Sequence, residues 1–364
     1  MSLEVIYVVR HGFRSAWSVD HLTGIYTAHI RSPTGLPTDP ALTSHGVEQA
    51  GELAEHLLRL DPPIDQVYSS PYYRCLQTIS PFVSRRNSTR NTALASQDVV
   101  TNPHLSIRVE SGLSEWYGRA HFEHPTSAPL DDLSPLFADL DTNYVSCFAP
   151  QRRGESIPQL YKRVASCMQD IITKCDQEGK KAVIICTHAA VVIALGRILT
   201  AKIPEDVSVA DFGAFTCGLS TYRRQKAHED CSATAVINMV TTTESQVQKH
   251  LDARSTTQAG DTQSTRWLHS MDHPKLGSRG PGDPGLESPP QICGFGLASH
   301  WTCEANSDCS FLRAGEERGW QFSGDESFIE TDRDSISPSI VEPRLNAVVE
   351  AEENSPSSTG ASKL

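Results

Sequence analysis

The chain has 364 residues, with 32 Lys and Arg against 44 Asp and Glu, so its formal charge is −12. No basic stripe or block of Lys and Arg accompanies this acidic balance, which argues against direct binding to nucleic acid. No apolar run approaches the roughly 20 residues that span a bilayer, so no membrane partner is expected.

Ten cysteines are scattered along the chain without a Cys-x-x-Cys pair, and some, such as Cys186 and Cys217, lie in apolar runs. We expect them to be reduced and to pack as small apolar side chains. An apolar strand begins within a few residues of Met1, where a signal peptide would otherwise lie. These features predict a protein of the cytoplasm or nucleus.

Composition divides the chain into regions. From Arg224 onward there are 12 Lys and Arg against 21 Asp and Glu, which leaves residues 1–223 close to neutral. Residues 224–298 are rich in Ser, Thr, Gln, Gly, Pro and Asp, so they cannot bury enough apolar surface to offset their chain entropy. We therefore predict a folded domain over 1–223, a disordered insertion over 224–298, a returning segment over 299–328 and a disordered acidic tail over 329–364.

Strands are expected wherever short apolar runs occur in the first region. Val5–Val9 is a continuous apolar run, typical of a central strand that is covered on both faces. Further strands are expected near Gln66–Ser69, Leu105–Glu110 and Ala182–Thr187.

Helices are expected between these strands. Ser44 is predicted to cap a helix with an apolar face that extends to Leu58 and ends before Asp61-Pro62-Pro63. A second apolar face extends from Leu160 to Ile172, and the almost uniformly apolar stretch Ala189–Leu199 predicts a buried helix.

This alternation predicts an α/β fold with three layers, α/β/α, around a mainly parallel sheet. In such sheets, ligands bind at the carboxyl ends of the strands. His11 and His188 each follow the end of a predicted strand, so we expect them to meet at one edge of the sheet.

Two β-like runs flank the predicted insertion, Ala214–Tyr222 and His300–Ala305. We predict that they pair, so that residues 299–328 complete the folded domain. The aromatic segment Trp320–Phe328 is interpreted as a docking element for a partner, with packing against the domain itself as an equally good alternative.

The residues that follow the first strand, Arg10-His11-Gly12, predict phosphoryl transfer. His11 is the candidate nucleophile, because a neutral imidazole can attack with one nitrogen while the other is held by a backbone carbonyl. Arg10 and Arg74 are expected to bind the phosphoryl oxygens, and Arg14 and His188 to add further donors. Backbone amides near Gly12 are predicted to contribute as well.

Glu115 is the candidate general acid. It lies next to Trp116 and Tyr117, which are expected to raise its pKa by desolvation. The arginines supply the positive charge that a metal would otherwise provide, so neither a metal nor another cofactor is expected. His121 and His124, with Glu123 between them, resemble a metal motif, but the sequence offers no third ligand at suitable spacing, so no metal site is expected there.

These motifs resemble those of the histidine phosphatase superfamily, also called phosphoglycerate mutase-like, over residues 3–223 and 299–328. The resemblance rests on Arg10-His11-Gly12, on Arg74, Glu115 and His188, and on the segment Leu42–Ala50. It implies a phosphoglycerate mutase-like fold and the hydrolysis of phosphomonoesters through a phosphohistidine. The substrate would be a phosphorylated small molecule or phosphoprotein.

The resemblance extends to substrate contacts and to partners. Thr43, in a segment that carries the resemblance, is expected to bind the substrate together with Gly12 and Trp116. The aromatic residues Trp17, Trp116 and Tyr117 favour an aromatic or bulky leaving group. The long loop Ala16–Pro40 departs from the mutase pattern and favours net hydrolysis. Fungal proteins of this type resemble a phosphatase-domain subunit of the general transcription factor serving RNA polymerase III. That resemblance implies an alternative role as a scaffold with protein partners in a transcription complex.

Overall fold

The computed structural model describes residues 2–28, 30, 32–95, 103–146, 148, 150–225 and 301–324. The predicted tail and nearly all of the predicted insertion lie outside the described residues, as do residues 325–328 of the returning segment. Among the residues that the structure describes, no helix is both long enough and apolar enough to cross a membrane.

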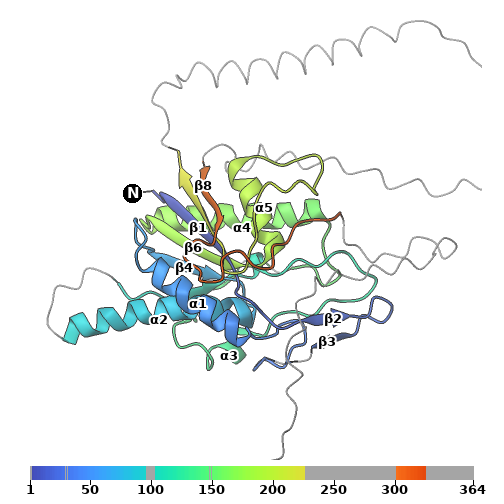
Figure 1. Cartoon of the computed structure of the whole chain (residues 1–364), viewed down its shortest axis with the longest axis horizontal. Helices are drawn as coiled ribbons and strands as arrows, with labels where there is room; N and C mark the ends of the chain where they lie inside the picture. Colours follow the sequence, from blue (N-terminus) through green and yellow to red (C-terminus); the bar gives the residue numbers. More distant parts are fainter. Residues whose placement is uncertain are drawn as a thin grey trace, which may run out of the picture. The chain divides into compact units, whose positions relative to one another are not determined.

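A six-stranded sheet forms the centre of the fold, with the strand order β5-β4-β6-β1-β7-β8 (Figure 1). The four strands from β5 to β1 are parallel, while β7 is antiparallel to both β1 and β8. The sheet is therefore mainly parallel, as predicted. Its strands are β1 (Val5–Arg10), β4 (Gln66–Ser69), β5 (Ile107–Val109), β6 (Ala182–Thr187), β7 (Leu219–Arg224) and β8 (Trp301–Asp308).

The central strand β1 alternates its side chains between two apolar cores. Ile6 and Val8 contact the cluster on one face of the sheet, whereas Val5, Tyr7 and Val9 contact the cluster on the other. A strand that is buried on both faces needs an unbroken apolar run, and this requirement explains why the sequence pattern located it.

Helices cover both faces of the sheet and complete the three layers (Figure 1). The helices α1 and α2 contribute to one apolar cluster, and α4 and α5 contribute to the other. The prediction that Ser44 caps the first helix is wrong by one residue, because Thr43 is the N-cap and accepts a hydrogen bond from the amide of Gly46. The helices are α1 (Ser44–Leu57), α2 (Tyr73–Ala95), α3 (Leu130–Leu133), α4 (Ile157–Gln177) and α5 (Ala189–Thr200), with a 3₁₀ turn at Ser111–Leu113.

A short hairpin occupies part of the segment that was expected to be a long loop. It consists of β2 (Trp17–Val19) and β3 (Tyr26–Ala28), and Trp17 pairs with Ala28. The hairpin forms a second, separate sheet and places Trp17 and Tyr26 beside the carboxyl ends of the central strands.

The predicted pairing of the two late strands is confirmed, since Arg224 of β7 is the register partner of Trp301 of β8. The first of these strands starts later than expected, because Cys217 has a positive φ of 56° and donates its amide hydrogen to the carbonyl of Arg10. After β8, the chain returns across the domain. Trp320 and Phe322 pack against the domain itself, which is the second of the two predicted alternatives for this segment.

Candidate active site

His11 and His188 meet at the carboxyl edge of the sheet, directly after β1 and β6. These strands are parallel neighbours in which Arg10 is the register partner of Thr187, so the residue after each strand reaches the same place. The two imidazole ring centroids lie 5.5 Å apart, and both side chains are buried.

His11 is held as a neutral imidazole with a defined tautomer. Its Nδ1 donates a hydrogen bond to the carbonyl oxygen of Gly12 over 2.8 Å, which leaves Nε2 with its lone pair free to react. Burial, followed by the charges of Arg74 and Arg10, lowers the pKa of His11 well below its usual 6.5. A nucleophilic imidazole must be unprotonated, and this environment keeps it so at neutral pH.

Three arginines surround His11, and each has a buried guanidinium nitrogen that donates no hydrogen bond within the described residues. The Nε atoms of Arg10, Arg14 and Arg74 have no hydrogen-bond partner within the described part of the chain. Burial and neighbouring arginines lower the pKa of Arg10 to about 10 and that of Arg14 to about 9. Clustered cations with unused donors at a sheet edge are suited to an anion such as a phosphoryl group.

Arg74 is fixed by two carboxylates. Its Nη2 donates to Glu115 over 2.9 Å, and its Nη1 donates to Asp39 over 3.3 Å and to the carbonyl oxygen of Thr38 over 2.9 Å. Burial disfavours the charge of the fully buried guanidinium, but Glu115 and Asp39 raise its pKa. The side chain therefore remains a cation inside the protein.

His188 lies between Glu115 and Ser70. Its Nδ1 is 3.3 Å from Glu115 Oε2, and its Nε2 is 2.7 Å from Ser70 Oγ. Burial alone would lower the pKa of His188, but the adjacent sulfur of Cys75 and the carboxylate of Glu115 raise it. His188 is thus able to supply positive charge to a bound anion.

Glu115 lies at the site, but its charge state differs from the expectation. Burial raises its pKa, as anticipated from its aromatic neighbours, yet His188 and Arg74 outweigh this effect and lower the pKa below the normal range. The predicted raised pKa of Glu115 is therefore wrong. The opposing charges come from residues distant in sequence, which a local motif cannot reveal.

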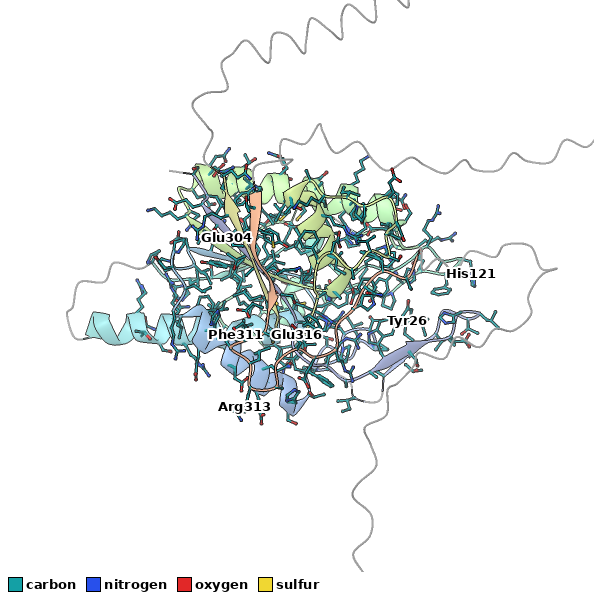
Figure 2. All side chains as sticks on the ribbon, turned by 45° about the horizontal axis from the view of Figure 1, so that its top comes forward. Tyr26, His121, Glu304, Phe311, Arg313 and Glu316 are labelled. Atoms are coloured by element: carbon teal, nitrogen blue, oxygen red, sulfur yellow. The ribbon has the colours of Figure 1, made fainter. Side chains whose placement is uncertain are left out.

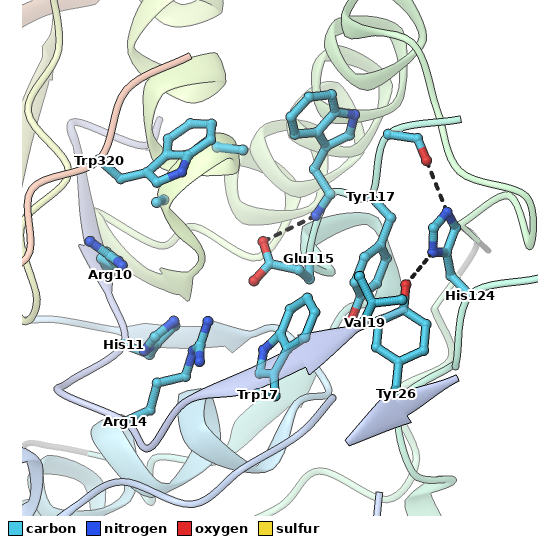
Figure 3. Close-up of a pocket in the computed structure, with 14 residues that line it drawn as sticks. Arg10, His11, Arg14, Trp17, Val19, Tyr26, Glu115, Tyr117, His124 and Trp320 are labelled. Carbon is cyan, nitrogen blue, oxygen red and sulfur yellow. Dashed lines mark hydrogen bonds between the residues drawn. The ribbon is translucent and has the colours of Figure 1, made fainter. Parts of the chain in front are cut away.

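A cavity of about 190 Å³ opens over these residues (Figure 3). Arg10, His11, Arg14 and Glu115 form its polar part, and Figure 3 shows Trp320 on one side and the hairpin residue Trp17 on another. The cavity can thus accept a charged group at the sheet edge and an apolar group beside the aromatic walls. Its aromatic lining consists of Trp17, Tyr26, Trp116, Tyr117, His124 and Trp320.

The predicted substrate contacts at Gly12 and Thr43 are replaced by structural roles. The amide of Gly12 donates to Thr78 Oγ1, and its carbonyl orients His11, so neither group is available to a ligand. Thr43 caps α1 and donates its hydroxyl hydrogen to the Phe13 carbonyl. Neither residue lines the cavity, whereas Trp116 does.

The sequence did not predict that His124 and Tyr26 line the cavity wall and contact each other. His124 donates from Nε2 to the Gly118 carbonyl over 2.9 Å and accepts from the Tyr26 hydroxyl at Nδ1 over 2.6 Å. It therefore connects the hairpin to the loop that carries Glu115 (Figure 3). The spacing of His121 and His124 indicates at most a weak metal motif, and the contact between His124 and Tyr26 spans 98 positions, so the sequence carries no local signal for it.

The only arrangement within the described residues with metal-ligand geometry is His11, Glu115 and His188, whose ligand atoms lie within 4.8 Å of one another. Arg10, Arg14 and Arg74 surround this cluster. Their combined charge opposes a divalent cation and favours an anion, so these donors fit phosphate better than metal.

Comparison with known proteins gives consistent matches. The sequence model of the histidine phosphatase superfamily (branch 1) matches residues 6–234. The transcription factor tau 55 kDa subunit of Saccharomyces cerevisiae is 29% identical over 238 residues, which cover 63% of this chain and 49% of the relative. The ecdysteroid-phosphate phosphatase of Drosophila melanogaster is 27% identical over 229 residues, which cover 56% of this chain and 28% of the relative.

Among solved structures, the ecdysone phosphate phosphatase of Bombix mori, in complex with tungstate, matches with a TM-score of 0.41. It is 21% identical, and the match covers 60% of this chain and 89% of that one. The chain spans about half the length of the yeast relative and less than a third of the Drosophila relative.

Proposed function

Because the chain belongs to the histidine phosphatase superfamily, we propose that it hydrolyses phosphomonoesters through a phosphohistidine on His11. The observation that carries this proposal is the state of His11, a neutral imidazole with its Nδ1 bound to Gly12, surrounded by three guanidinium groups with unused Nε donors. No metal or other cofactor takes part in the proposed reaction, because the arginines provide the charge stabilisation.

In the first step, His11 Nε2 attacks phosphorus and the bond to the leaving oxygen breaks. Glu115 donates the proton that this oxygen needs. The carboxylate is ionised beside His188 and Arg74, but the dianion of a bound phosphate ester brings negative charge next to it and competes for these two residues, which raises the pKa of Glu115 so that it takes up a proton from solvent. In the second step, Glu115 takes a proton from the water that attacks the phosphohistidine, and inorganic phosphate leaves.

The direct test is turnover of 4-nitrophenyl phosphate in the presence of a chelator, combined with acid-quench trapping of the phosphoenzyme. We expect the wild-type protein to release 4-nitrophenol and to trap one acid-labile phosphate, and His11→Ala to do neither. Glu115→Gln should still trap phosphate from a donor with a good leaving group, because only proton transfer is impaired. Turnover that persists in a folded His11→Ala protein would exclude the mechanism.

A second candidate function is that of a scaffold subunit in a nuclear transcription complex. The observation that favours it is the similarity to the yeast transcription factor tau subunit. The two roles make different demands on the site, since a scaffold needs the surface of the domain but not His11. This role is tested by purifying the wild-type and His11→Ala chains from nuclear extract and identifying, by mass spectrometry, the proteins that co-purify with each. Recovery of the same large assembly with both chains supports the scaffold, whereas recovery with neither contradicts it.

A further inference from the structure

The segment after β8 reaches the active site from the edge of the sheet. Because β8 is antiparallel to β7, and β7 to β1, the end of β8 lies at the same edge as the end of β1, where His11 follows. The chain then lies along α1, where the ring of Phe311 stacks on His56 and Arg313 pairs with Glu52 (Figure 2).

Residues 316–322, here called the strap, cross from α1 to the cavity. Glu317 anchors the strap on α1, since its carboxylate accepts hydrogen bonds from Gln49, over 2.7 Å, and from His45. The carbonyl of Glu317 accepts from the amide of Thr216, and the guanidinium of Arg318 lies over the Phe13 ring at 3.9 Å. Both the backbone and the side chains of the strap are therefore fixed.

The strap makes a direct contact with the phosphate-binding groups. Arg10 Nη1 donates to the carbonyl oxygens of Arg318 and of Ala214. Arg318 has a positive φ of 47°, a conformation that costs energy for a residue with a side chain and persists only where the surroundings fix it. These two carbonyls hold one end of the Arg10 guanidinium, whose buried Nε has no hydrogen-bond partner within the described residues.

Beyond Arg318, the strap forms a wall of the cavity. Trp320 lines the cavity, and its ring lies 4.9 Å from that of Phe322, centroid to centroid. Phe322 is buried against Trp116, with ring centroids 5.4 Å apart. Figure 3 shows Trp320 across the cavity from Trp17, with Glu115 between them.

We propose that the strap sets the substrate selectivity of this site, with Trp320 limiting the size of the leaving group and Glu317 positioning Arg10 through the carbonyl of Arg318. The proposal rests on the phosphatase function proposed above. It assigns a role in selectivity to a segment that is separated from the other site residues by residues 225–300.

Trp320→Ala tests the wall. In this variant, kcat/KM for the bulky substrate 4-methylumbelliferyl phosphate should rise about tenfold relative to that for phenyl phosphate, because apolar contacts in a pocket have this magnitude. Trp320→Phe should give an intermediate ratio. Gln321→Ala is the matched control, since its side chain is exposed on the same strap, and its ratio should equal that of the wild type. A ratio in folded Trp320→Ala within twofold of the wild type would overturn the role of Trp320.

Glu317→Ala tests the anchor by a measurement that does not depend on turnover. Binding of inorganic phosphate, measured by titration calorimetry, should weaken about tenfold, because the Arg10 donors lose their fixed orientation. Glu317→Gln keeps an acceptor for Gln49 and should restore most of the affinity. Unchanged phosphate affinity in Glu317→Ala would overturn the positioning role. Absence of turnover and of phosphoenzyme in the wild type would instead refute the proposed function, while the calorimetry would still decide the anchor.

Discussion

Arg14→Met is expected to stabilise the protein while weakening its affinity for anions. Burial, together with the charge of Arg74, lowers the pKa of Arg14 from 12.5 to about 9. The guanidinium is protonated at pH 7 in both the folded and the unfolded chain, so the full difference opposes folding at that pH and fades only when the pH rises through 9. The difference corresponds to roughly 5 kcal/mol, an upper limit because water reaches part of the side chain.

The contacts that Arg14 would lose offset part of this gain. Its Nη1 donates one hydrogen bond to the Ser15 carbonyl over 2.9 Å, and its guanidinium lies 5.6 Å from the centroid of the Trp17 ring. Together these contacts contribute about 1–2 kcal/mol. We therefore expect Arg14→Met to raise the free energy of unfolding by about 1–3 kcal/mol, once solvent screening is taken into account.

Urea unfolding at pH 7, with and without tungstate, measures both halves of this prediction. Arg59→Met is the control, because Arg59 is exposed just beyond α1, and it should change the free energy of unfolding by less than about 0.5 kcal/mol. Tungstate should stabilise the wild type more than Arg14→Met, since only the wild type has the complete set of donors. An Arg14→Met protein that is less stable than Arg59→Met would refute the view that the arginine cluster opposes folding.

Three other substitutions separate support of the fold from chemistry. Thr43→Ala should lower the free energy of unfolding by about 1 kcal/mol through loss of the helix cap, and an increased KM for 4-nitrophenyl phosphate would instead indicate a substrate contact. Gly12→Ala places a Cβ 2.9 Å from the Gly46 carbonyl oxygen, so it should destabilise the fold by about 1–3 kcal/mol and reduce phosphoenzyme trapping; a wild-type yield would contradict this. Burial raises the pKa of Glu115, but His188 and Arg74 together lower this pKa by more than burial raises it, so the net pKa is below the usual 4.5. The ionised carboxylate therefore stabilises the fold above pH 4.5, and this stabilisation is lost as the pH falls below that value. Melting temperatures from pH 6 to about pH 3 should therefore fall less steeply for Glu115→Gln than for the wild type, and parallel curves would show that the ionised form is not favoured.

The meeting of His11 and His188 was predictable because it depends on a rule of parallel sheets. Each residue follows an apolar run, and the runs became the neighbouring strands β1 and β6. Because these parallel strands are hydrogen-bonded in register, the residues that follow their carboxyl ends lie side by side at one edge of the sheet. The β-like sequence pattern also predicted the pairing of β7 and β8, although residues 225–300 separate these two strands.

Residues that act through single long-range contacts could not be predicted in the same way. Asp39 supports Arg74, and Ser70 contacts His188, but each such contact is one hydrogen bond without a repeating pattern in the sequence. The charge state of Glu115 illustrates the same limit. Its sequence neighbours predicted a raised pKa, whereas the folded chain places Arg74 and His188 within 3.3 Å of its carboxylate.

The pairing of Arg224 with Trp301 has a consequence for how the domain can vary. The chain leaves the sheet and rejoins it at adjacent positions, so lengthening the intervening sequence costs only about 0.6 kcal/mol per doubling. Insertions and deletions can accumulate there with little effect on the geometry of His11. Related chains can therefore diverge widely in the length between these strands while keeping one catalytic centre.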